Sequence, residues 1–227
     1  MNAEDDINLL TVIVDTNPAA WAAAANDPER PLDFIKIIEQ ILIFINAHLS
    51  LKFDNELAII ASHTNQSRFL YPLPPTDPEA ALLDAPKKPA NAYKQFFDVD
   101  QGVVMKLKEL VAESKEADEE NKSMIAGSLS LAQSYINRVK RANENSNVQS
   151  RILVISISPD LPSQYIATMN CIFAAQKGAT RIDVCRFQGR NYGGDSVFLP
   201  QASHITGGIF LEIPEPRNLL QYLLVRR

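Results

Sequence analysis

The chain has 227 residues, of which 46% are hydrophobic and 22% are charged, so it is long enough and apolar enough to bury a sizeable core. Its net charge of -5 and its pI near 5.3 argue against a broad phosphate-binding surface, and we expect no direct sequence-specific contact with nucleic acid. The basic residues Arg138, Lys140 and Arg141 are interpreted as the solvated end of a helix.

Targeting and redox signals are weak in this sequence. No run of roughly 18 or more apolar residues occurs and the N-terminal segment is acidic, so we expect neither a membrane span nor secretion. Cys171 and Cys185 stand in apolar surroundings without CxxC spacing, and we expect both to be buried, reduced thiols of an intracellular protein.

The first part of the chain predicts two buried strands around a helix. Residues 7–14 are a continuous apolar run rich in branched side chains, which is typical of a central strand covered on both faces. Apolar residues at helical spacing follow in 32–49, with Pro31 in the first turn. Residues 56–63 predict a second strand, and 66–72 predict its hairpin partner at the edge of the sheet.

The middle of the chain predicts two helices and two exposed connections. Residues 72–94 are rich in proline and lack periodicity, so we expect an exposed insertion that interrupts the domain. A long helix is predicted over 99–115, and the charged stretch 113–122 reads as a solvated linker. Residues 122–140 predict another helix with an apolar stripe.

The last part of the chain alternates predicted strands and helices. The strands are expected at 151–158, 180–187 and 209–213, and the helices at 162–178, 195–208 and 217–225. Strands separated by helix-length segments call for an α/β fold, a doubly wound and mostly parallel sheet with helices on both faces and one antiparallel edge strand. We expect a single domain over 1–227.

An aspartate, Asp15, follows the first predicted strand, at the kind of strand end where α/β proteins place ligands. The segment DTNPAAW contains no glycine, which argues against a dinucleotide site, and the chain has no phosphate-binding GxxxxGK[ST] loop. A phosphotransferase of the haloacid dehalogenase type would need a second aspartate two residues further on, where Asn17 stands.

A metal-dependent nuclease is the enzyme hypothesis that stays open. The letters VDTN resemble the opening of PIN-type nucleases, in which an aspartate at this strand end helps to bind divalent metal. Such a site needs several convergent carboxylates. Glu39 could be a second ligand, although a solvated face of its helix is the simpler interpretation, and Asp160 is the acid that the later strand ends supply.

The order of the predicted elements also resembles von Willebrand factor A domains, which carry a metal-ion-dependent adhesion site built on DxSxS. Asp15 matches the first position, Asn17 and Ala19 replace the two serines, Ser128 corresponds to the threonine of a later loop, and Ser158 stands where a second aspartate is expected. One carboxylate with a few neutral oxygens would bind Mg²⁺ poorly. We therefore expect a degenerate site in which Asp15 is structural, and a metal-dependent ligand-binding A domain is a further alternative.

Long blocks in order give a more specific resemblance. The chain resembles the family of small von Willebrand A-type core subunits of the general transcription factor TFIIH. Four blocks carry this resemblance: INLLTVIVDTNPAAW, ILIFINAHLSLKFDNELAIIASH, SLSLAQSYINR and QASHITGGIFLEIPEPRNLLQYLL. The resemblance implies a non-enzymatic, nuclear subunit that serves RNA polymerase II transcription initiation and nucleotide excision repair. It also implies a partner, the RING-like C-terminal domain of the other A-type TFIIH subunit.

The family continues into a cysteine-rich zinc segment, whereas this sequence ends at YLLVRR. We expect that segment to be absent here and therefore expect no cofactor in this chain. For the partner surface, the hypothesis is the small-residue side of helix 122–140, where Ala126, Ser130 and Gln133 would allow close backbone approach. An ordinary exposed helix face is the alternative interpretation.

Overall fold

The computed structural model describes residues 6–73, 94–113, 122–144, 146–189, 192–194 and 196–225. Its centre is a six-stranded sheet of order β3-β2-β1-β4-β5-β6, in which only β3 is antiparallel to its neighbour. The strands are β1 (Asp6–Asp15), β2 (Glu56–Ser62), β3 (Ser67–Tyr71), β4 (Asn147–Ser156), β5 (Arg181–Phe187) and β6 (Phe210–Ile213). The predicted fold class and the antiparallel edge strand are confirmed.

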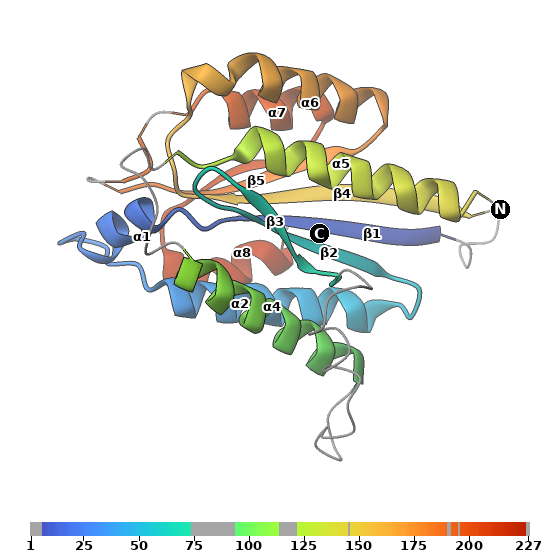
Figure 1. Cartoon of the computed structure of the whole chain (residues 1–227), viewed down its shortest axis with the longest axis horizontal. Helices are drawn as coiled ribbons and strands as arrows, with labels where there is room; N and C mark the ends of the chain where they lie inside the picture. Colours follow the sequence, from blue (N-terminus) through green and yellow to red (C-terminus); the bar gives the residue numbers. More distant parts are fainter. Residues whose placement is uncertain are drawn as a thin grey trace.

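Helices cover both faces of the sheet: α5, α6 and α7 lie on one face, and α2, α4 and α8 lie on the other (Figure 1). The helices are α1 (Pro18–Ala25), α2 (Phe34–Leu51), α4 (Lys94–Glu113), α5 (Ile125–Ala142), α6 (Tyr165–Lys177), α7 (Phe198–Thr206) and α8 (Leu219–Val225), with 3₁₀ turns at Pro162–Gln164 and Pro216–Asn218. The described elements thus form one sheet and its two covering layers.

Strand β1 is the centre of the sheet because both of its faces are apolar. Leu10, Val12 and Val14 point to the core shared with α2 and α8, while Leu9 and Ile13 point to the core beneath α5. Val12 and Ile13 are both fully buried. The continuous apolar run in the sequence therefore reflects two separate cores on opposite sides of one strand.

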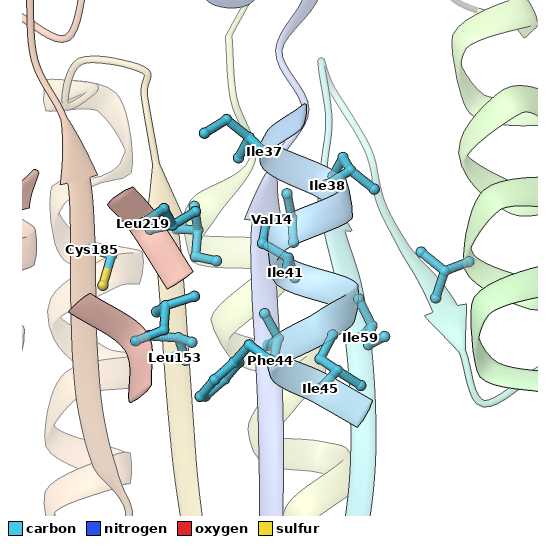
Figure 2. Packing of buried hydrophobic residues seen from close by; sticks show 14 of the residues in the cluster. Val14, Ile37, Ile38, Ile41, Phe44, Ile45, Ile59, Leu153, Cys185 and Leu219 are labelled. Carbon is cyan, nitrogen blue, oxygen red and sulfur yellow. The ribbon is translucent and has the colours of Figure 1, made fainter. Parts of the chain in front are cut away.

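Helix α2 fills the core on one face of the sheet. Figure 2 shows Ile37, Ile41 and Phe44 directed from α2 towards the strands, against Val14 of β1 and Leu219 of α8. By length and composition alone α2 could cross a membrane. In the described fold, however, the apolar side of α2 is buried in the core against the sheet.

Several predicted boundaries differ from the structure. Asp33 caps α2, its side chain accepting from the backbone N–H of Ile35 at 3.0 Å, so Pro31 precedes the helix and does not belong to its first turn. Helix α5 begins at Ile125 and not at 122, and β4 ends at Ser156 and not at 158. The proline-rich insertion predicted at 72–94 and the charged linker fall mainly on 74–93 and 114–121, which lie outside the described residues.

The two cysteines differ in burial. Cys185 is buried in β5 as predicted, but Cys171 on α6 is only half-buried, because it lies between α5 and α6 with its Sγ 3.6 Å from the carbonyl oxygen of Ala126. Burial raises the pKa of the Cys171 thiol. Both cysteines are free thiols.

Candidate functional site

The candidate site lies where the carboxyl ends of β1, β2 and β4 meet. Asp15, the last residue of β1, is paired in register with Ser62, the last residue of β2. On the other side of β1, the chain leaves β4 through Ile157 and Ser158. Parallel strands bring these ends to one edge of the sheet, where the structure brings Ser158 into contact with Asp15.

Asp15 is fully buried, and both of its carboxylate oxygens accept hydrogen bonds from the chain. Its Oδ1 accepts from the backbone N–H of Asn17 at 3.2 Å and from the Oγ–H of Ser123 at 3.1 Å. Its Oδ2 accepts from the N–H groups of Ile157 at 3.2 Å and Ser158 at 2.8 Å. The side chain therefore ties three separate segments together at the sheet edge.

Asn17 explains the sequence NPAA after the strand. Its Oδ1 accepts from the N–H of Ala19 at 3.1 Å and so caps α1, and Pro18 takes the first helical position. Its Nδ2 donates to the Oγ of Ser158 at 3.2 Å. Ala19 contributes only its backbone N–H, because its methyl side chain has no ligand atom.

Trp21 anchors α1 to the same strand end. Its indole Nε1–H donates to the backbone carbonyl of Asp15 at 2.8 Å, and its ring packs against Phe34 and Phe187 at centroid distances of 4.7 and 6.0 Å. Both polar ends of Asp15, the carbonyl and the carboxylate, are thus held by neighbouring elements.

The serine that contacts Asp15 from the segment before α5 is Ser123, which corrects the prediction of Ser128. Ser123 Oγ also lies 3.0 Å from the Oγ of Ser62, and this gives a buried chain from Ser62 through Ser123 to Asp15. Ser128 lies further along, on α5, with its Oγ 2.9 Å from the Oγ of Ser67. The prediction failed because Ser128 lies inside the first turn of α5, whereas Ser123 precedes the helix and reaches the sheet edge.

Thr16 and His63 form the flank of the site. His63 Nδ1 lies 2.8 Å from the carbonyl oxygen of Thr16 and 3.1 Å from its Oγ1, while Thr16 N–H donates to Ser62 O at 2.9 Å. Burial lowers the pKa of His63, although the hydrogen bond to Thr16 and the charge of Asp15 act in the opposite direction. The imidazole therefore links the ends of β1 and β2.

The carboxylates of the nuclease hypothesis do not converge. Asp160 caps α7: its Oδ2 accepts from the N–H of Phe198 at 2.7 Å and its Oδ1 from Ser196 Oγ at 3.0 Å. Glu39 is exposed on α2, in keeping with a solvated helix face. Within the described ranges no group of three or more His, Cys, Asp or Glu side chains could hold a metal ion.

The residues at this edge do not fit a divalent cation. Mg²⁺ and Ca²⁺ require several oxygen ligands with enough negative charge to offset dehydration. Among the described residues, Asp15 is the carboxylate bonded to these strand ends, and both of its oxygens already accept from buried N–H groups that a cation would have to displace. Asp160 lines a small pocket with Ser123 and Ser158, but its oxygens accept at the start of α7. The arrangement is that of a structural hydrogen-bond centre.

The predicted partner surface on α5 is corrected in two of its three residues. Ala126 is buried: its carbonyl lies 3.6 Å from Cys171 Sγ on α6, and its N–H donates at 3.3 Å to Oε1 of Gln164 in the turn before α6. Gln133 also faces α6 and donates from Nε2 to the carbonyl of Cys171 at 2.6 Å. These side chains serve helix–helix packing within the domain, and of the three predicted residues Ser130 is the exposed one.

Comparisons with known proteins agree on one family. The family model described as Transcription factor Tfb4 matches residues 7–226. The general transcription and DNA repair factor IIH subunit tfb4 of Schizosaccharomyces pombe is 40% identical over 224 residues, which are 99% of this chain and 70% of that protein. The TFB4 subunit of Saccharomyces cerevisiae is 31% identical, over 97% of this chain and 68% of its own length.

Solved structures show the same relationship. The crystal structure of the TFIIH p34 N-terminal domain superimposes with a TM-score of 0.79 and 36% identity, covering 98% of this chain and 99% of that one. The SpRpn10 VWA domain gives a TM-score of 0.60 at 13% identity, over 97% and 95% of the two chains, a likeness of fold alone. The chain has a von Willebrand factor A-like fold and belongs to the transcription factor Tfb4 family.

Proposed function

We propose that this chain is a non-enzymatic scaffold subunit of the TFIIH core, nuclear, acting in RNA polymerase II transcription initiation and nucleotide excision repair. It does so by binding the RING-like C-terminal domain of the other von Willebrand A-type subunit. The names of its relatives support a place in TFIIH. The partner domain is the one implied by the family resemblance.

The hydrogen-bonded state of Asp15 carries the non-enzymatic part of this proposal. A catalytic or adhesive metal centre needs carboxylate oxygens directed towards an open coordination position. Asp15 is fully buried, and its two oxygens accept from four groups of the chain. A degenerate adhesion site that now fixes the strand ends accounts for these contacts, and it suits a protein whose role is to present its surface to other subunits.

Calorimetric titration of the chain with the RING-like domain tests the proposal, run in parallel in Mg²⁺-containing and Mg²⁺-free buffer. We expect the same affinity in both buffers, and a melting temperature of the free chain that Mg²⁺ leaves unchanged, because only a ligand of the folded state stabilises it. Binding that requires Mg²⁺ would favour the adhesion-domain alternative. Cleavage of nucleic acid that Asp15→Ala abolishes would favour the nuclease alternative.

A further inference from the structure

Helix α6 carries apolar side chains on the side that faces solvent as well as on the side that faces the sheet. Met169 and Ile172 point inward and are buried. Ile166 and Phe173 are 72% and 52% exposed. Because 166 and 173 are seven residues apart, they lie on one face of the helix, with exposed Asn170 between them and exposed Lys177 one turn beyond. We call Ile166, Asn170, Phe173 and Lys177 the outer α6 stripe.

The spacing of this stripe is that of a helix-packing seam. Residues at i, i+4, i+7 and i+11 form the row that a helix presents to a neighbouring helix. The row spans about 16 Å between Ile166 and Lys177 at the usual helical rise. Exposed apolar residues are ordinary, and α2 also carries exposed Ile35 and Ile43. What sets the α6 pair apart is that the helices of its layer contain no acidic residue.

The three helices on the α6 side of the sheet carry basic but no acidic residues. The chain has 27 acidic residues, yet none of them lies in α5, α6 or α7, all of whose residues are described. These three helices carry the cations Arg138, Lys140, Arg141 and Lys177. On the opposite face of the sheet, α4 alone contains four acids.

Three of these cations, Lys140, Arg141 and Lys177, belong to the C-terminal ends of α5 and α6, whereas Arg138 lies over the ring of Tyr135. Lys140 Nζ donates to the carbonyl oxygen of Gly178 at 2.9 Å, which joins the C-terminal ends of α5 and α6. Arg141 and Lys177 are exposed at these same two helix ends, and Glu144 follows just beyond α5. A partner that lies along the stripe therefore meets apolar side chains first and positive charge at one end.

We propose that the outer α6 stripe is a docking surface for an acidic amphipathic helix of a partner protein. Its apolar side packs on Ile166 and Phe173, and its carboxylates pair with Lys177 and Arg141. Protein interfaces have large aliphatic and aromatic contacts at the centre and charge at the rim. A nucleic acid would instead need contacts from cations to its phosphates along the whole row. The inference rests on the proposed scaffold role and adds to it a docking surface for an acidic helix, besides the contact with the RING-like domain.

Hydrogen–deuterium exchange of the chain, free and within a TFIIH core reconstituted from its subunits, tests this surface. We expect peptides from 165–177 to gain protection on assembly. Phe173→Glu should weaken incorporation by at least about tenfold, because it places an unpaired charge in an apolar contact. Lys177→Glu should weaken incorporation less, and the incorporation of this variant should depend less on salt concentration than that of the unmodified chain.

Ile35→Glu is the matched control. Ile35 is 68% exposed on α2, on the opposite face of the sheet, so this variant should enter the core like the unmodified chain. If the unmodified chain enters the core while α6 exchange stays the same and Phe173→Glu has no effect, the docking surface is wrong and the scaffold role stands. If the unmodified chain does not enter the core, the scaffold role itself fails.

Two other occupants would also overturn the proposal. Self-association of the free chain that Phe173→Glu abolishes, measured by light scattering after size exclusion, would assign the stripe to a second copy. Binding of a DNA duplex that Lys177→Glu abolishes, measured by fluorescence anisotropy, would assign the cations to nucleic acid.

Discussion

The edge of the sheet around Asp15 and the outer face of α6 use their side chains in opposite ways. At the edge, the polar groups are buried and bonded to one another, so that an apparent ligand site is closed. On α6, Ile166 and Phe173 are apolar yet exposed. The comparison teaches that a polar cluster at a strand end can be structural, while an interaction surface can lie on a helix without any chemical motif.

The largest expected effect is that of Asp15→Ala on stability. The change leaves the N–H groups of Ile157 and Ser158 buried without their acceptor, and we expect a loss of about 3–5 kcal/mol in the free energy of unfolding. Urea denaturation in EDTA is the measurement. If the carboxylate served to bind a metal ion, its removal in EDTA should change the free energy of unfolding little. An unchanged midpoint of urea denaturation would therefore contradict a structural role for Asp15.

An intermediate effect is expected from Ser123→Ala, which removes one hydrogen bond to Asp15 and one to Ser62. The cost should be about 1 kcal/mol. A double-mutant cycle with Asp15→Asn should show a coupling of roughly 0.5–1 kcal/mol for Ser123→Ala, and additivity for the control Ser128→Ala, whose hydroxyl contacts Ser67. Coupling to Ser128 instead would restore the original prediction from the sequence.

The smallest effect should come from Phe173→Glu on the stability of the free chain. Because Phe173 is half exposed and its helix is held by buried residues on the other side, we expect a change within about 0.5 kcal/mol. Thermal melting of the isolated variant checks this. A large loss would mean that Phe173 packs within the domain, and would remove the basis for treating it as a contact residue.

Local pattern predicted the elements well because each has its own periodicity. The apolar run of β1 and the helical spacing of α2 gave the right structures, whereas the short helix α1, which begins at Pro18, was not predicted. Only the Asp33 cap shows that the second helix begins after Pro31. The first residue of a helix depends on which of several nearby residues forms the capping hydrogen bond, and the sequence alone does not decide this.

The site was predicted in part. Asp15 and Asn17 follow one predicted strand and Ser158 ends another, and parallel strands end at one edge, so their meeting could be expected. Ser62 and His63 end a predicted strand at the same edge and could have been added on that ground. Ser123 could not, because it precedes α5 in a short segment whose position depends on where that helix begins.

The sequence by itself determined the fold class, the family and the single carboxylate at the strand end, since these follow from periodicity, from long ordered blocks and from residue type. Only the tertiary structure decided that Asp15 accepts four internal hydrogen bonds and that Ala126 and Gln133 face α6 within the domain. The physical reason is that the same residue types can bond inward or outward, and the choice depends on which segments fold against them.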